Sequence, residues 1–254
     1  MTKTAVITGV GRRRGIGAGL AAGLAADGWD LALSYWTPYD ERLGYEGTPS
    51  DPSALARELR AEHGIAVELV PADLADPASP STLVDAARRR FGGVDALVMS
   101  HCESVDSSVL TTTVDSFDRH YAVNVRASWL LVKTFAEQLG PNGGSVVALT
   151  SDHTVDNVPY GATKGALDRL VLAAAHELAD RGLRANVINP GPVDTGWMEP
   201  AWRDDLTAMQ PSGRLGTPSD IADTVRFLLS DRGRWITGQL LSVNGGFPKG
   251  RLPV

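Results

Sequence analysis

The chain has 254 residues, of which 43% are hydrophobic and 21% are charged, and its net charge is −6. These values are typical of a folded globular protein and argue against disorder. The acidic balance argues against a nucleic-acid partner, and no apolar run approaches the ~18 residues of a membrane helix, so no membrane contact is expected. Cys102 is the single cysteine, which excludes an internal disulfide. With no signal peptide in the sequence, we expect a cytoplasmic protein.

Short apolar runs alternate with amphipathic segments along the whole chain. The runs that predict strands are residues 4–8, 31–35, 67–72, 96–100, 145–151, 185–189 and 240–243. Helices are expected at residues 18–26, along the apolar stripe from Leu167 to Leu178, and after Thr217, which is a suitable N-cap before Pro218. This alternation predicts an α/β protein with a doubly wound Rossmann fold. It would have one parallel seven-stranded sheet flanked by helices, in a single domain covering residues 1–254.

Two long connections interrupt this pattern. Residues 37–52 are rich in turn formers, and residues 192–216 carry Trp197, Met198, Trp202 and Met209. Long connections in compact domains are often functional. We interpret residues 192–216 as a loop that covers the substrate, with an oligomer contact or ordinary surface packing as the alternatives.

A glycine-rich turn joins the first strand to the first helix. Gly9, Gly15 and Gly17 allow a phosphate to approach the backbone, and the helix that starts near Ile16 offers unpaired N–H groups. The second strand ends at Ser34, Tyr35 and Trp36, with no acid to bind a ribose 2′-hydroxyl. Since Arg12 and Arg13 could pair with a 2′-phosphate, we expect NADPH rather than NADH. The alternatives are solvated loop arginines and a Tyr35 that packs instead of stacking on adenine.

A second set of residues indicates proton chemistry. Tyr160 and Lys164 are four residues apart and therefore share one helix face. Ser151 ends the preceding strand, and Asn124 lies further upstream. A free tyrosine has a pKa of about 10, and a cation about 4 Å away in a partly shielded site supplies about 4 kcal/mol toward lowering it. The alternative is an exposed tyrosine, a solvated lysine and a serine at a strand end.

Taken in order, these residues resemble the short-chain dehydrogenase/reductase family over essentially the whole chain. Residues 236–239 and 243–246 resemble the 3-oxoacyl-acyl-carrier-protein reductase-like branch of that family. The resemblance implies that Tyr160 is the general acid, that Lys164 also holds the nicotinamide ribose, that Ser151 binds the substrate oxygen and that Asn124 holds a water. It also implies further cofactor contacts at Asp73, Leu74, Ser100, Pro190, Gly191 and Thr195. A homotetramer built by residues 116–138, residues 160–180 and the last strand is implied as well.

Three segments depart from the family pattern. The glycine loop is two residues longer than usual, Met99-Ser100-His101-Cys102 replaces Asn-Asn-Ala-Gly, and the loop from Ser151 to Tyr160 is short. We interpret His101 and Cys102 as structural because adjacent strand residues point to opposite faces. The five histidines lie at no metal-ligand spacing, so no metal is expected.

These observations predict an NADPH-dependent carbonyl reductase. Its substrate would be a small carbonyl compound, either a 3-oxoacyl thioester linked to a carrier protein or coenzyme A or a ketone of specialised metabolism. The alternatives are an alcohol or sugar dehydrogenase working in the oxidative direction and a non-catalytic dinucleotide-binding protein. An acidic carrier would favour basic residues near the cleft, for which the candidates are Arg126, Arg169, Arg203 and Arg214.

Overall fold

The computed structural model describes residues 2–45, 51–153 and 155–248. Its centre is a seven-stranded sheet in the order β3-β2-β1-β4-β5-β6-β7, and every strand pair is parallel. The strands are β1 (Thr4–Thr8), β2 (Asp30–Tyr35), β3 (Val67–Pro71), β4 (Ala96–Met99), β5 (Gly144–Leu149), β6 (Leu183–Asn189) and β7 (Leu240–Ser242). The predicted doubly wound sheet is confirmed, and the predicted strand ends differ from these by at most two residues.

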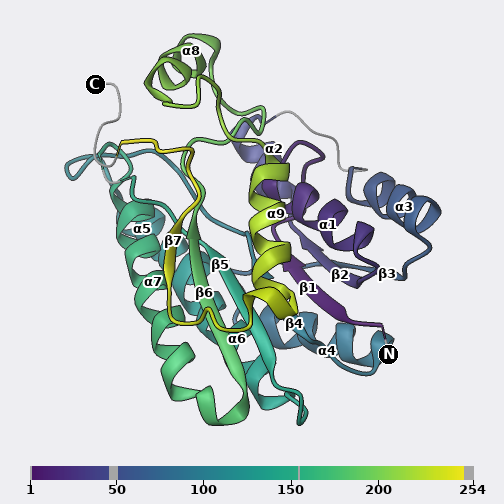
Figure 1. Cartoon of the computed structure of the whole chain (residues 1–254). Helices are drawn as coiled ribbons and strands as arrows, with labels where there is room; N and C mark the ends of the chain where they lie inside the picture. Colours follow the sequence, from purple (N-terminus) through teal and green to yellow (C-terminus); the bar gives the residue numbers. More distant parts are fainter. Residues whose placement is uncertain (1, 46–50, 154, 249–254) are drawn as a thin grey trace.

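Helices cover both faces of the sheet (Figure 1). On one face lie α1 (Ile16–Ala26), α3 (Asp51–His63) and α9 (Pro218–Leu229), packed over one apolar cluster. On the other lie α4 (Ser79–Phe91), α6 (Ala127–Glu137) and α7 (Val158–Glu177), over a second cluster. The sheet strands contribute buried residues to both clusters, which explains why their sequences are apolar without strict alternation.

Four shorter elements complete the part that bears on function. They are α2 (Thr37–Leu43), α5 (Val114–His120), the π-helix η1 (Tyr121–Arg126) and α8 (Pro200–Met209). Two 3-10 turns, η2 (Ala179–Arg181) and η3 (Asp231–Gly233), lie at helix ends. The prediction of turn-rich loops at residues 37–52 and 192–216 was therefore wrong in part, because each contains a helix. In both, a proline in the first turn supplies a backbone angle suited to a helix start.

The order of the strands determines where a ligand can bind. The chain moves outward from β1 to β3 and then returns to place β4 on the other side of β1. Such a reversal leaves a crevice at the carboxyl ends of the strands. In Figure 1 this edge lies at the top of the sheet, below α8 and beside α2.

Candidate functional site

A cavity of about 940 Å³, called the cleft below, opens at the carboxyl ends of the strands. It gathers residues from segments far apart in the sequence. The predicted site residues that line it are Gly9, Arg12, Gly15, Ile16, Gly17, Tyr35, Asp73, Leu74, Ser100, Ser151, Tyr160, Lys164, Pro190, Gly191 and Thr195. Two predicted residues, Arg13 and Asn124, do not line it.

The glycine loop leaves no room for side chains on its inner side. Gly9 has a φ of +77°, and a Cβ there would lie 2.6 Å from the carbonyl oxygen of Ser100. A Cβ at Gly17 would lie 2.5 Å from the carbonyl oxygen of Gly9. Gly15 is the N-cap of α1 and has no side-chain cap, so the helix start presents its N–H groups to the cleft. This backbone cradle fits the phosphates of a dinucleotide.

The arginines of the glycine loop have different surroundings. Arg12 lines the cleft, where Nε lies 3.1 Å from the Asp40 carboxylate, Nη1 donates to the Thr195 carbonyl oxygen and the guanidinium stacks 4.8 Å from the Tyr45 ring centroid. Arg13 instead forms two hydrogen bonds with Glu58 on the surface. Of the two predicted phosphate ligands, only Arg12 therefore faces the cleft.

Ser151, Tyr160 and Lys164 come together on one wall of the cleft. Tyr160 and Lys164 lie one turn apart on α7, and the Lys164 ammonium lies 5.6 Å from the Tyr160 ring centroid. That ammonium donates to the Leu149 carbonyl oxygen at 2.8 Å, at the end of β5. The Ser151 hydroxyl lies close enough to Tyr160 to lower the pKa of its phenol. A phenol, a hydroxyl and an ammonium thus share one site.

The pKa of Tyr160 shifts in the direction opposite to the sequence-based expectation. Burial raises this pKa, and the nearby Ser151 hydroxyl only partly opposes the shift. Lys164 is itself buried, which lowers the pKa of its ammonium. The protein by itself therefore holds Tyr160 as the neutral phenol, which is the form that can donate a proton.

Asn124 supports the site from behind the cleft wall. It lies in the π-helix η1, a rare conformation that often marks functional positions. Its side-chain oxygen accepts from the Glu103 N–H, and its side-chain nitrogen donates to the Glu103 carbonyl oxygen and to Thr163 on α7. Asn124 thereby ties the loop after β4 to the helix that carries Tyr160 and Lys164.

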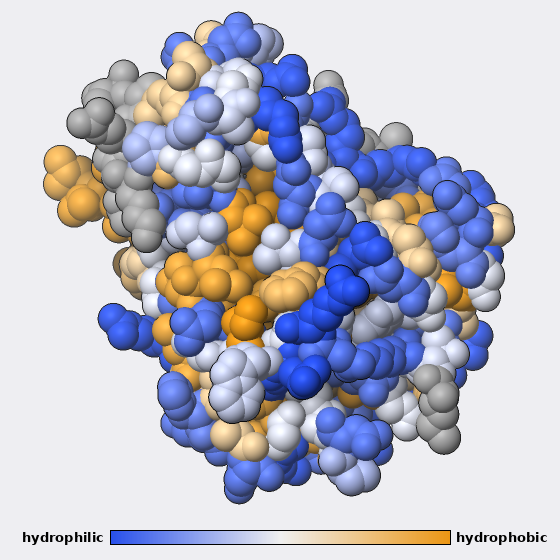
Figure 2. Space-filling model, in the orientation of Figure 1, coloured by the Kyte–Doolittle hydropathy of each residue, from blue (hydrophilic) through white to orange (hydrophobic). Residues whose placement is uncertain are grey.

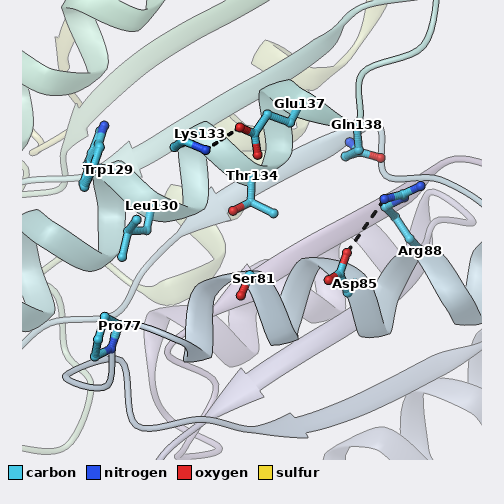
Figure 3. Close-up of a pocket in the computed structure, with 10 residues that line it drawn as sticks. All are labelled: Pro77, Ser81, Asp85, Arg88, Trp129, Leu130, Lys133, Thr134, Glu137 and Gln138. Atoms are coloured by element: carbon cyan, nitrogen blue, oxygen red, sulfur yellow. Dashed lines mark hydrogen bonds and ion pairs between the residues drawn. The ribbon is translucent and has the colours of Figure 1, made fainter.

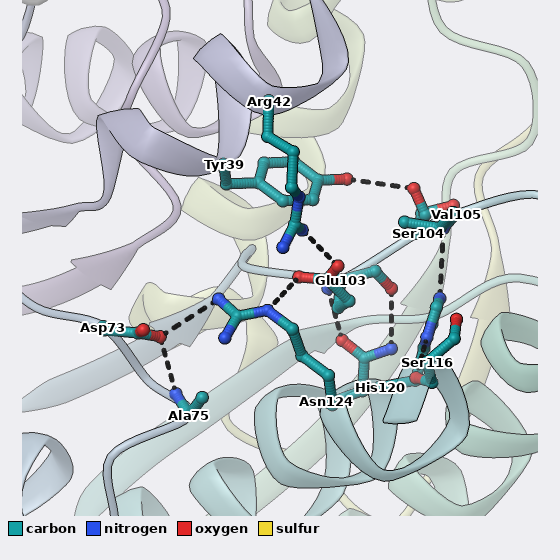
Figure 4. A network of polar contacts seen from close by, with 11 residues as sticks. Tyr39, Arg42, Asp73, Ala75, Glu103, Ser104, Val105, Ser116, His120 and Asn124 are labelled. Carbon is teal, nitrogen blue, oxygen red and sulfur yellow. Dashed lines mark hydrogen bonds and ion pairs between the residues drawn. The ribbon is translucent and has the colours of Figure 1, made fainter. Parts of the chain in front are cut away.

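Glu103 is the centre of a charged network that the sequence analysis did not identify (Figure 4). Its carboxylate is buried and pairs with Arg42 on α2 and with Arg119 on α5. Arg119 also lies 3.4 Å from Asp73, one of the cofactor contacts that the family resemblance implies. Buried charges need such partners, so this network fixes the loop after β4 against α2.

The helix α2 forms a further wall of the cleft. Tyr39, Asp40 and Tyr45 line the cleft, and the Tyr39 hydroxyl donates to the Ser104 carbonyl oxygen. The only available sequence signal was Pro38 in a helix-start position, since Ser104 and Arg12, which hold these side chains in the cleft wall, lie more than 25 positions away along the chain.

His101 is buried and Cys102 lines the cleft. The His101 ring contacts the Thr8 hydroxyl through Nδ1 at 2.7 Å and the Val123 carbonyl oxygen through Nε2 at 3.1 Å. Because a carbonyl can only accept, Nε2 carries the proton, and Nδ1 accepts from Thr8. Burial lowers the pKa of His101 to about 3, so the ring is neutral at neutral pH.

Outside the cleft, a groove of about 400 Å³ runs between α4 and α6 and is lined mainly by polar side chains (Figure 3). It contains none of the predicted site residues. Within the described ranges, no three His, Cys, Asp or Glu side chains are grouped so that they could hold a metal ion. No helix in the same ranges is both long and apolar enough to cross a membrane.

Comparisons with known proteins agree with this geometry. A family model described as enoyl-(acyl carrier protein) reductase matches residues 9–248. An uncharacterized oxidoreductase of Methylorubrum extorquens is 34% identical, over 96% of this chain and 97% of its own. The 3-oxoacyl-(acyl-carrier-protein) reductase FabG of Staphylococcus aureus is 30% identical, over 97% and 98%. A metagenomic blue fluorescent protein, solved in complex with NADPH, is 33% identical with a TM-score of 0.85, over 96% and 97%.

Proposed function

Since the chain belongs to the short-chain dehydrogenase/reductase family of oxidoreductases, we propose that it is an NADPH-dependent carbonyl reductase. The observation that carries the proposal is the meeting of Ser151, Tyr160 and Lys164 in the cleft that also contains the glycine cradle. The NADPH complex of a related structure supports the choice of cofactor. The name of the Staphylococcus aureus relative supports a carbonyl substrate.

The residues of the cleft divide into two groups by the part of the reaction they would serve. Gly9, Gly15, Ile16 and Gly17 would hold the phosphates, with Arg12 beside the 2′-phosphate. The other proposed cofactor contacts are Tyr35, Asp73, Leu74, Ser100, Pro190, Gly191 and Thr195. A bound NADPH supplies a hydride to the carbonyl carbon.

The second group would deliver the proton. Ser151 would hold the substrate oxygen by a hydrogen bond, and the Tyr160 phenol would donate its proton to that oxygen as the hydride arrives. Lys164 would hold the nicotinamide ribose and stabilise the negative charge left on Tyr160. Asn124 would position Lys164 and its helix and hold a water behind them. Arg13 has no role in this scheme, because its guanidinium is paired with Glu58 away from the cleft.

The test is NADPH oxidation by the purified protein with a panel of ketones, diketones and thioesters, alongside the Tyr160→Phe variant. General acid catalysis contributes about 10²–10⁴-fold, so the variant should lose at least about 100-fold in kcat. It should still bind NADPH, measured by the enhancement of nicotinamide fluorescence. A parent protein that binds NADPH but reduces no carbonyl would instead favour a non-catalytic dinucleotide-binding protein. Turnover only with alcohols or sugars would favour the oxidative alternative.

A further inference from the structure

We propose that the substrate is an uncharged carbonyl compound with an aromatic group, and not a thioester of a phosphorylated carrier. This inference rests on the proposed reductase function and narrows its substrate class. It is drawn from the shape and the charge of the half of the cleft that lies beyond Ser151 and Tyr160.

One side of this half is aromatic and apolar. Trp197 and Trp202 meet edge to face, with ring centroids 4.9 Å apart and an interplanar angle of 74°. Both line the cleft, together with Met198, Leu206 and Phe247. Leu206 is the buried residue of α8 and anchors that helix. Aromatic rings favour offset and edge-to-face partners, so this wall offers a ring-shaped ligand specific contacts.

The rim of the same half is acidic. Asp106, Asp152, Asp156 and Glu199 line the cleft, and the described residues offer none of them an ion-pair partner. Asp106 accepts a hydrogen bond from the Asn157 amide, while Asp152, Asp156 and Glu199 are exposed. The rim therefore presents negative charge to whatever enters the cleft.

The cations that line the cleft do not offset this charge. Arg12 pairs with Asp40, and Arg119 pairs with Asp73 and Glu103. The Lys164 ammonium is bound to the Leu149 carbonyl oxygen below Tyr160. All three belong to the part of the cleft assigned to NADPH and the proton donor.

The arginines suggested earlier as contacts for an acidic carrier do not line the cleft. Arg203 pairs with Asp194, Arg214 pairs with Asp220, and Arg126 donates to the Ala75 carbonyl oxygen. Coenzyme A and phosphopantetheine both carry phosphate groups, which the acidic rim would repel. An acidic carrier protein would be repelled in the same way.

The experiment compares the kcat/KM values of four thioesters as substrates of the unmodified protein at saturating NADPH. The acyl group is either benzoylacetyl or acetoacetyl, and the thiol is either neutral N-acetylcysteamine or coenzyme A. We expect kcat/KM to be highest for the neutral benzoylacetyl thioester and about tenfold lower for its coenzyme A counterpart at low salt, with the gap narrowing as salt rises. The neutral acetoacetyl thioester should also be about tenfold poorer, because it cannot use the aromatic wall.

Two test variants, each with a matched control, show which residues cause the charge effect and the phenyl preference. Asp152→Asn with Glu199→Gln should narrow the gap between the neutral and coenzyme A thioesters, while Asp204→Asn with Asp205→Asn, on the part of α8 outside the cleft, should leave it unchanged. Trp197→Ala should reduce the preference for benzoylacetyl, while Leu110→Ala, at an exposed side chain outside the cleft, should not.

Equal or better turnover of the coenzyme A thioesters, or no preference for the phenyl group, would overturn this inference and leave the reductase proposal standing. A protein that reduces none of the four thioesters and no other carbonyl compound would refute the reductase proposal itself.

Discussion

At the scale of single residues, Arg12 and Arg13 are adjacent in sequence but have different structural roles. Arg12 lies within the cleft between Asp40, Thr195 and Tyr45, whereas Arg13 forms a surface pair with Glu58. A charge-assisted hydrogen bond contributes about 1.5–3 kcal/mol. We therefore expect Arg12→Ala to raise the KM for NADPH about tenfold or more while changing the KM for NADH little.

Arg13→Ala is the matched control for this prediction, since it removes the same charge from the next position. It should leave both KM values close to those of the parent, as measured by initial rates with each cofactor. If Arg13→Ala weakened NADPH selectively and Arg12→Ala did not, the surface arginine would have to leave Glu58 to bind the phosphate.

His101 makes a separate contribution, to the pH dependence of stability. Its pKa is lowered to about 3 in the folded protein, against about 6.5 when unfolded. Between these values only the unfolded chain binds the proton, so the free energy of unfolding falls as the pH decreases from about 6.5 toward 3. The loss through this residue is at most about 5 kcal/mol.

Urea denaturation at a series of pH values checks this prediction in the parent and in His101→Gln. The variant loses ring contacts and should be less stable near neutral pH, so the slope of stability against pH is the informative quantity. That slope should be shallower in His101→Gln over pH 4–6. Parallel curves would mean that His101 is protonated in the folded state.

At the scale of elements, the start of α9 illustrates how residues that mark a helix start in the sequence also stabilise the folded protein. Thr217 accepts from the Asp220 N–H, and the Asp220 carboxylate accepts from the Thr217 N–H and pairs with Arg214. The sequence predicted this N-cap, and the structure confirms it. Thr217→Ala should lower the free energy of unfolding by about 1 kcal/mol. The exposed Ser219→Ala is the control and should change it by less than about 0.5 kcal/mol, both measured by chemical denaturation.

The elements that the sequence could predict are those determined by local periodicity. Buried parallel strands give apolar runs and α7 gives a helical stripe, so both were recognised. The short helices α2 and α8 were missed, because each lies in a segment rich in proline and polar residues that suits a loop equally well. Their helical state depends on tertiary packing, such as the burial of Leu206 on α8.

The same distinction applies to the cleft. Tyr160 and Lys164 share a helix face, so their approach could be predicted from spacing alone. The pairing of Glu103 with Arg42 and Arg119 joins three separate segments, and no local pattern encodes it. The direction of the Tyr160 pKa shift was predicted wrongly for a related reason, since burial depends on the whole fold and raises this pKa by more than the Ser151 hydroxyl lowers it.

At the scale of the whole molecule, apolar side chains remain exposed on two separated surfaces. On α5, η1 and α6 these are Phe117, Tyr121 and Trp129, with Trp129 51% exposed. Around the sheet edge at β7 they are Trp235 and Leu240, and Figure 2 shows apolar residues gathered on the face that carries β7 and α9. Both surfaces belong to the segments from which a homotetramer was expected, and exposed apolar patches commonly mark interfaces.

We therefore propose a homotetramer with two kinds of interface, which predicts a species of about four times 26.9 kDa by size exclusion with light scattering. Trp129→Glu would place a charge in one interface only, so it should yield a dimer that retains the interface at the sheet edge. Lys133→Glu with Glu137→Lys, which exchanges the charges of an exposed ion pair one turn further along α6, should leave the tetramer intact. A monomer in the parent protein, or a tetramer that persists in Trp129→Glu, would contradict this assembly.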